Sequence, residues 1–230
     1  MNRKTVIVMG KGTLAVKIAD WFRASDEYRL LCVVPNMPES SWTASLKDWA
    51  EGNEESYVAS GKVADIADVK RAAWRVDLAV SVTYDKIIRQ WFIDKCDKII
   101  NIHNGPLPRY RGVNPINWAL KNNEQQHGVT IHEITAGIDD GPILNQVLFP
   151  VNPVVDEVID VYERSLHFGW QVFKETMPKL WSIRAEPQDH SKAQYFSAKD
   201  FPKLGDRSHF TRAESIAKLG LQAAATRQSA

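Results

Sequence analysis

Cysteine, long apolar runs and an excess of charge of either sign are all scarce in this chain of 230 residues. Cys32 and Cys96 lie in apolar surroundings without metal-ligand spacing, which favours buried thiols of a reducing compartment over a disulfide. No stretch approaches the roughly 20 apolar residues that a membrane-spanning helix needs. The 29 basic and 28 acidic residues leave a net charge of +1, which gives no general electrostatic reason to bind nucleic acid or an anionic membrane. We therefore predict a cytoplasmic protein with neither nucleic acid nor membrane as a partner.

The first hundred residues alternate between short apolar runs and segments with helical spacing of apolar side chains. Such apolar runs, stopped by glycine or proline, are typical of strands buried on both faces of a parallel sheet. The predicted strands are 5–9, 29–34, 78–82 and 98–103, with a short one at 57–58. The predicted helices are 14–24, 40–49, 65–74 and 86–93. This order predicts a parallel sheet covered on both faces.

The pattern changes after residue 128, where two alternating runs, 129–134 and 143–149, are joined by a turn containing Asp139, Asp140 and Gly141. They predict an antiparallel edge of the same sheet. A long helical segment follows over 155–181, and the remaining tail is polar and interrupted by Pro187 and Pro202. We therefore expect an α/β, doubly wound, mostly parallel sheet in residues 1–184, with a short C-terminal extension in residues 185–230.

The densest cluster of polar residues follows the predicted strand 98–103. Asn101 and His103 are two residues apart on that strand, so their side chains point to the same side. They lie at its carboxyl end, where open α/β sheets bind ligands. The loop that follows, residues 104–112, has two prolines, two glycines and two arginines, which makes it stiff. A polar pair at this position marks a site about as often as it merely caps a loop.

The turn with Asp139 and Asp140 is the second cluster. An aspartate in a turn usually binds its own backbone, but one of these two could equally face His103. An aspartate–histidine pair suits acid–base chemistry near neutral pH, because the carboxylate orients the imidazole and stabilises its charged form.

A third candidate is the sequence Gly10, Lys11, Gly12 and Thr13 between the first strand and helix. Free amides at a helix start, together with the charge of Lys11, favour an anion such as phosphate. The sequence is neither a Walker motif nor a full dinucleotide fingerprint, so a plain tight turn is the alternative.

The sequences 101–103, 107–112, 128–131 and 137–141, in this order, resemble the 10-formyltetrahydrofolate-dependent formyltransferases. The resemblance extends over about residues 5–181 and is most specific between Asn101 and Gly141. It implies a Rossmann-like formyltransferase fold, 10-formyltetrahydrofolate as formyl donor and no metal. The loop at Gly105 and Pro106 departs from the family, in which many members have Ser-Leu, and this puts details of the acceptor side in doubt.

The resemblance also implies residue roles. Asn101 would stabilise the oxyanion that forms when an amine attacks the formyl carbon, and His103 would take the proton of the amine. Asp139 matches the aspartate of the family and would hold His103. The loop after the strand 78–82 matches the folate-binding loop of the family. The residues assigned to the folate are Tyr84, Lys86, Ile87, Ile88 and Asp140.

The acceptor is predicted from the remaining resemblance. The sequence 107–112, with Arg109, and the tail around Tyr195 and Phe196 resemble the N-formyltransferases of nucleotide-linked amino sugars, which serve surface polysaccharide synthesis. Tyr195 and Phe196 are candidates to stack on the base, or else they dock the tail. Glycinamide ribonucleotide formyltransferase is an alternative, as is a formyltetrahydrofolate hydrolase. Transfer RNA is disfavoured, because residues 185–230 are short beside the extra domain of the tRNA enzymes. Whether the protein forms a homodimer is left open by the sequence.

Overall fold

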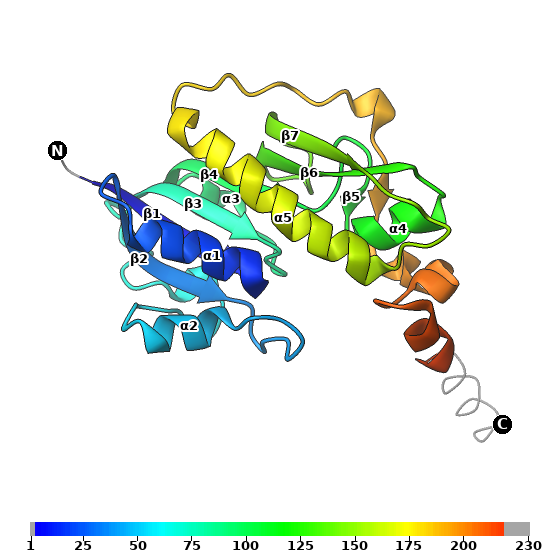
Figure 1. Ribbon diagram of the computed structural model, residues 1–230. Helices are drawn as coiled ribbons and strands as arrows, with labels where there is room; N and C mark the ends of the chain where they lie inside the picture. The colour runs from blue at the N-terminus through cyan, green and yellow to red at the C-terminus, as the bar shows by residue number, and fades with distance from the viewer. Residues whose placement is uncertain (1–2, 219–230) are drawn as a thin grey trace.

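The computed structural model describes residues 3–218 and contains a six-stranded sheet with the strand order β2-β1-β3-β4-β6-β7 (Figure 1). Its strands are β1 (Lys4–Gly10), β2 (Tyr28–Pro35), β3 (Val76–Val82), β4 (Cys96–His103), β6 (Gln126–Glu133) and β7 (Ile143–Pro150). The pairs among β1 to β4 are parallel, whereas β6 is antiparallel to both β4 and β7. The predicted mostly parallel sheet with an antiparallel edge is confirmed.

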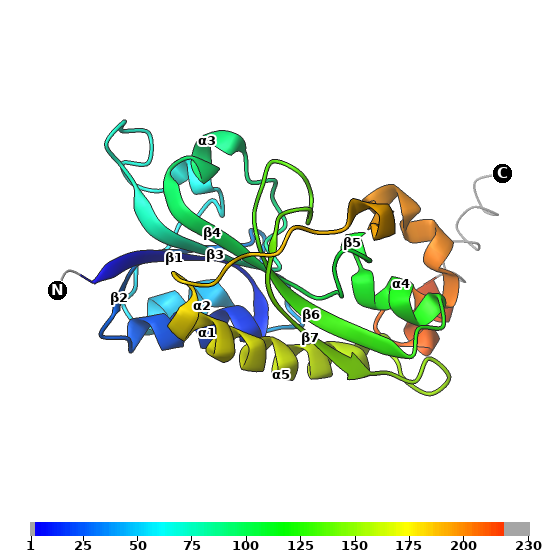
Figure 2. The ribbon, with the colours of Figure 1, turned by 90° about the horizontal axis from the view of Figure 1, so that it is seen from above.

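Helices α1 (Gly12–Arg23), α2 (Leu46–Gly52) and α5 (Val158–Thr176) cover one face of this sheet, and α3 (Gln90–Ile93) lies on the other (Figure 2). Strand residues alternate between the two cores: Ile100 and Ile102 pack in the cluster of α1 and α5, and Ile99 packs in the opposite cluster with Phe92. The second face is covered mainly by irregular chain that includes the short helix η1 (Val63–Asp65). None of the helices in residues 3–218 is long and apolar enough to cross a membrane.

Two predicted helices are wrong or much shorter. The segment 65–74 forms turns, because Asp68 adopts a left-handed φ of +61° that stops helix growth between the buried side chains Ile66 and Val69. The predicted helix 86–93 forms only over α3, which leaves residues 83–89 as a loop beside the site. The predicted helix 40–49 begins at Leu46, after the N-cap Ser45. At 57–58 there is only an isolated bridge, between Tyr57 and Val33.

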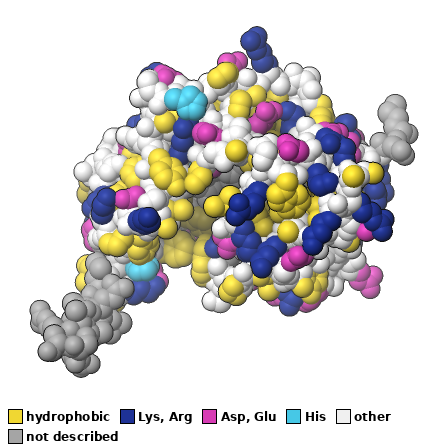
Figure 3. Space-filling view, turned by 180° about the vertical axis from the view of Figure 1, so that it is seen from behind, with side chains coloured by type: hydrophobic (Ala, Val, Ile, Leu, Met, Phe, Trp, Pro, Cys, Tyr) yellow, Lys and Arg dark blue, Asp and Glu magenta, His cyan; other side chains and the backbone are white. Residues whose placement is uncertain are grey.

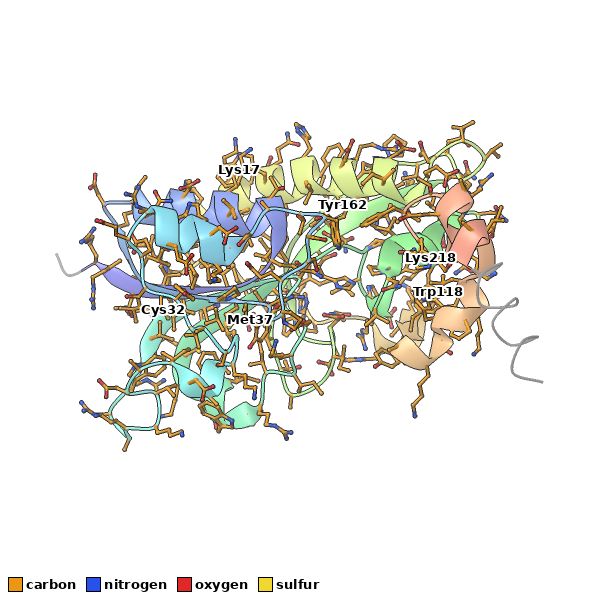
Figure 4. All side chains as sticks on the ribbon, turned by 90° about the horizontal axis from the view of Figure 1, so that it is seen from below. Lys17, Cys32, Met37, Trp118, Tyr162 and Lys218 are labelled. Atoms are coloured by element: carbon orange, nitrogen blue, oxygen red, sulfur yellow. The ribbon has the colours of Figure 1, made fainter. Side chains whose placement is uncertain are left out.

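The chain after α5 returns to the other end of the sheet. It passes through η2 (Met177–Lys179) and runs back over the molecule to η3 (His190–Lys192), β8 (Tyr195–Phe196) and η4 (Ala198–Arg207) (Figure 1). There β8 pairs with β5 (Arg111–Gly112), and η4 packs on α4 (Pro115–Lys121). Trp118 of α4 lies beside this orange segment (Figure 4). The tail that the sequence predicted as a polar extension is thus folded against the main domain as far as Arg212, whose guanidinium donates to the Pro153 carbonyl, and 219–230 lie outside the described residues.

Candidate active site

A cavity of about 520 Å³ lies at the carboxyl ends of β3 and β4. The chain leaves β1 for β2 on one side and returns to β3 on the other, so β1 is the switch point of the sheet, beside which open α/β sheets bind ligands. Asn101, His103 and Asp139 all line this cavity, together with Tyr84 and Tyr195. The two clusters of polar residues that stand apart in the sequence thus meet at one cavity.

The antiparallel pairing of β4 with β6 builds the floor of the cavity. Asn101 lies opposite His132, and His103 lies opposite Thr130. All four side chains point away from the face that α1 and α5 cover, because the intervening residues Ile102 and Ile131 belong to that core. The space-filling view of this back side shows hydrophobic side chains around a hollow (Figure 3).

Asp139 reaches the floor from the turn between β6 and β7. Its Oδ2 lies 3.5 Å from Nδ1 of His103 and accepts a hydrogen bond of 2.8 Å from the amide of Gly112. Its Oδ1 lies 3.4 Å from both Nδ2 of Asn101 and Nε2 of His132. Asp139 has a φ of +51°, a left-handed conformation that aspartate tolerates better than most residues. The turn therefore points this carboxylate at three polar side chains.

The pKa of Asp139 reflects these neighbours. Burial alone would raise the pKa of the carboxyl, but the charge of His103 and the hydrogen bond from Gly112 outweigh burial and hold it below its usual value. Asp139 is therefore ionised throughout the pH range of an enzyme assay.

The orientation of His103 is set by a backbone carbonyl. Its Nε2 lies 2.8 Å from the carbonyl oxygen of Tyr110, which can only accept, so Nε2 carries a hydrogen. Nδ1 is then the nitrogen that can take a proton, and it faces Asp139. The tautomer of His103 is therefore fixed by the Tyr110 carbonyl, and Asp139, which we expected to hold His103, contacts its other ring nitrogen. With both ring nitrogens facing acceptors, the arrangement suits the imidazolium that forms after proton uptake.

His132 is a site residue that the sequence did not reveal. It is 2% exposed, its Nδ1 donates to the Glu133 carbonyl at 2.8 Å, and its Nε2 lies 3.2 Å from Nδ2 of Asn101. Because Nδ2 of Asn101 can only donate, Nε2 of His132 accepts from it and orients the Asn101 amide. Its alternation along β6 was compatible with a purely structural residue, since only the register of β6 against β4 brings it to Asn101.

The loop after β4 is held by side chains of the antiparallel edge. Thr130 donates to the Gly105 carbonyl at 2.7 Å, and Gln146 donates to the Leu107 carbonyl at 2.9 Å. A side chain at Gly105 would begin 2.8 Å from Nε2 of His103. The departure from the family at Gly105 therefore leaves room for His103 in its present position.

Of the five residues predicted to contact the folate, all but Asp140 line the cavity. Tyr84, Lys86, Ile87 and Ile88 all contribute to its wall. Ile87 on this loop and Ile138 on the opposite turn are exposed apolar side chains, as a flat aromatic ligand between them would require. Asp140 does not line the cavity: its carboxylate accepts from Thr135 in its own turn, so the predicted folate contact of Asp140 is not supported.

Arg109 does not line this cavity either. Its guanidinium pairs with Glu124 at 3.0 Å on the outer side of the loop. The neighbouring Arg111 is buried instead and binds Gln188. Neither arginine of this loop lines the cavity, so the predicted acceptor contact of Arg109 is not supported by its position.

The predicted anion site at Gly10–Thr13 is weakened by backbone contacts. The amides of Lys11 and Gly12 already donate to the carbonyls of Val82 and Ala44, both at 3.2 Å. The ammonium group of Lys11 donates to Ser40, and Thr13 lines a second cavity of about 410 Å³ together with Trp42 and with Tyr162 of α5. The geometry therefore favours the alternative of a tight turn for Lys11 and Gly12.

Tyr195 and Phe196 have different environments. Tyr195 is 54% exposed and lines the cavity, as a residue that stacks on a base would. Phe196 is stacked between Tyr110 and Trp118, with ring centroids 5.6 and 4.5 Å away, and fixes the tail to the domain. Phe196 is therefore a packing residue. No group of histidine, cysteine and acidic side chains in residues 3–218 is placed to hold a metal ion.

Comparison with known proteins gives a consistent family. A family model described as formyl transferase matches residues 3–177. A methionyl-tRNA formyltransferase of Koribacter versatilis is 32% identical over 178 residues, 74% of this chain and 57% of that protein. A phosphoribosylglycinamide formyltransferase of Haemophilus influenzae is 26% identical over 211 residues, 89% of this chain and 98% of that protein. The match spans only 38% of the methionyl-tRNA formyltransferase of Fervidobacterium nodosum, so the chain covers less than two thirds of the length of either methionyl-tRNA formyltransferase.

Solved structures give the same fold. An N-formyltransferase of Helicobacter canadensis, in complex with folinic acid and dTDP-3-aminofucose, is 28% identical with a TM-score of 0.73 and covers 86% of this chain, which covers 72% of it. WlaRD, a sugar 3N-formyl transferase with dTDP and 5-N-formyl-THF, is 30% identical with a TM-score of 0.72, with coverage of 86% and 70%. Glycinamide ribonucleotide transformylase 1 of Symbiobacterium toebii is 25% identical with a TM-score of 0.65, with coverage of 82% and 95%.

Proposed function

This chain belongs to the formyl transferase family, and on that premise we propose that it transfers the formyl group of 10-formyltetrahydrofolate to the amine of a nucleotide-linked amino-deoxy sugar. The observation that carries the proposal is the convergence of Asn101, His103 and Asp139 on one cavity floor. A carboxyamide donor, a histidine with one ring nitrogen that can take a proton, and an ionised carboxylate are the groups that acyl transfer to an amine requires.

The roles follow from the contacts. One N–H of Asn101 donates to Nε2 of His132. Its other N–H makes only a 3.4 Å contact with Asp139, so this N–H can donate to the formyl oxygen that gains charge when an amine attacks. His103 takes the proton of the amine at Nδ1, because Nε2 is bound to Tyr110. Asp139 stabilises the resulting imidazolium and is ionised at every assay pH. None of these steps forms a covalent bond to the protein.

Two observations favour a nucleotide-linked amino sugar as acceptor. Tyr195 offers an exposed aromatic face at the edge of the cavity, where a base could stack. The solved structures with 28% and 30% identity and TM-scores of 0.73 and 0.72 are both sugar N-formyltransferases. Glycinamide ribonucleotide is the second candidate, because this chain covers 98% of the Haemophilus influenzae enzyme.

The test is a panel of acceptors with 10-formyltetrahydrofolate, followed by mass spectrometry. The panel contains nucleotide-linked 3-amino and 4-amino sugars, glycinamide ribonucleotide and a reaction without acceptor. A mass gain of one formyl group on an amino sugar supports the proposal. Formylation of glycinamide ribonucleotide alone would favour the second candidate, and formate release without acceptor would favour a hydrolase.

A further inference from the structure

We propose that Gln188, in the segment after α5, is a positioning residue that holds the Asp139 turn in the geometry that formyl transfer needs. The inference rests on the proposed function of Asp139. It goes beyond it by assigning a role in the reaction to a residue outside the family match, which ends at residue 177.

The side chain of Gln188 is buried, with 6% exposure, and all of its polar atoms are engaged. Its Nε2 donates to the carbonyls of Asp139 at 2.9 Å and Gly141 at 2.7 Å. Its Oε1 accepts from Nε of Arg111 at 3.0 Å and from Nη2 at 2.6 Å. One amide thus connects a buried cation to two carbonyls of the turn that contains Asp139.

The turn needs such support because its conformation is unfavourable by itself. Asp139 has a left-handed φ of +51°, which costs conformational energy for a residue with a side chain. A side chain at Gly141 would collide with the Glu133 carbonyl, so the turn lies tightly against the end of β6. Hydrogen bonds to the carbonyls on both sides of Asp140 oppose relaxation of this turn.

Two consecutive residues, Arg111 and Gly112, hold Asp139. Arg111 acts on its backbone through Gln188, and Gly112 binds its carboxylate. Arg111 holds Gln188, and the amide of Gly112 donates to Oδ2 of Asp139 at 2.8 Å. Gly112 has a φ of +93°, and a side chain there would collide with the Phe196 carbonyl of β8. The pairing of β5 with β8 therefore fixes the two residues that hold Asp139 from both sides.

The alternative is that Gln188 only docks the tail to Arg111. The segment has another attachment, since Ile143 and Glu186 exchange backbone hydrogen bonds of 2.7 and 2.8 Å. The two roles differ in which half of the amide matters. Docking needs the oxygen that Arg111 binds, whereas positioning needs the N–H groups that bind the carbonyls of Asp139 and Gly141.

The test separates the two halves with Gln188→Glu and Gln188→Met. Glutamate keeps an acceptor for Arg111 but has no N–H for the carbonyls, and methionine keeps the volume but neither hydrogen bond. We expect kcat to fall by ~10- to ~100-fold in both variants, the size of effect that a small misplacement of a reacting group produces. The KM for 10-formyltetrahydrofolate and the stoichiometry of folinic acid binding should stay at wild-type values. Gln194→Met, an exposed glutamine of the same segment, is the matched control.

A further readout is local to the turn. Amide hydrogen exchange in the turn 135–141 should become faster in both Gln188 variants and not in Gln194→Met. Folinic acid binding with one site per chain shows that a variant is folded. Should the methionine variant lack that stoichiometry, the glutamate variant carries the test through its Arg111 contact.

Wild-type kcat and wild-type exchange in Gln188→Glu would overturn the proposal and leave docking as the role of Gln188. The variant Asp139→Asn distinguishes this from failure of the proposed function. If Asp139→Asn is inactive while Gln188→Glu is fully active, only the positioning role is wrong. If Asp139→Asn is as active as the wild type, the proposed function of Asp139 is wrong, and hydrogen exchange still reports whether Gln188 holds the turn.

Discussion

Replacing Asp139 by asparagine removes the charge of the site while keeping its size and its hydrogen-bonding capacity. Oδ2 of Asp139 lies 3.5 Å from Nδ1 of His103, and both side chains are largely buried. Removing one partner of a buried charge pair costs about 3–5 kcal/mol. Since the pair forms fully only when His103 has taken the proton, most of this cost falls on the transition state. At ~1.4 kcal/mol for each factor of ten, we expect kcat to fall by ~10²- to ~10³-fold.

The matched control is Asp140→Asn. Asp140 is adjacent in the same turn, but its carboxylate accepts from Thr135 and does not line the cavity. We expect its kcat to stay within a few-fold of the wild type. The assay is formyl transfer from 10-formyltetrahydrofolate at several pH values on either side of neutral. Because the pKa of Asp139 lies below its usual range, Asp139→Asn should lower kcat at every pH of the profile. A larger loss of kcat in Asp140→Asn would refute the assignment.

Three further changes have defined outcomes. His103→Asn should lower kcat by ~10²- to ~10⁴-fold while folinic acid binding persists, and near-normal turnover would exclude His103 as the base. Tyr195→Ala should raise the KM for the nucleotide-linked acceptor but not for 10-formyltetrahydrofolate, and Tyr195→Phe should stay close to the wild type. A wild-type KM for the acceptor in Tyr195→Ala would exclude stacking. Burial lowers the pKa of His127 to about 4 in the folded protein, so the unfolded chain binds the extra proton below pH ~6.5 and stability falls towards pH ~4, by roughly 3 kcal/mol. His127→Gln, compared with the wild type by urea unfolding at both ends of this range, should lose that pH dependence, and an unchanged dependence would contradict the assignment.

The strands were predictable because each buried strand is a continuous apolar run. Runs such as residues 78–82 of β3 end at a glycine, a proline or a polar loop, and their order fixes the parallel part of the sheet. The prediction of a helix over 65–74 was wrong because helical spacing of a few apolar residues also fits turns that bury Ile66 and Val69. The left-handed φ of Asp68 that separates them has no signature in the local sequence.

The site was predictable where its residues are close in sequence and not where they are joined by the fold. Asn101 and His103 share a strand, and Asp139 follows a recognisable turn. His132 was missed because its role depends on the register of β6 against β4. Gln188 was missed because it reaches the Asp139 turn only after the chain has crossed back from α5. Neither long-range approach can be derived from spacing along the chain.

Transfer of a labelled formyl group from folate to sugar is the reaction that the site is proposed to catalyse. The wild-type protein is incubated with 10-formyltetrahydrofolate labelled with carbon-13 in the formyl group and with the best acceptor of the panel. We predict a formamide carbon signal on the nucleotide-linked sugar with the wild type, reduced at least ~10²-fold in rate with His103→Asn. A label that stays on the folate, or that appears only as free formate, would contradict the proposed function.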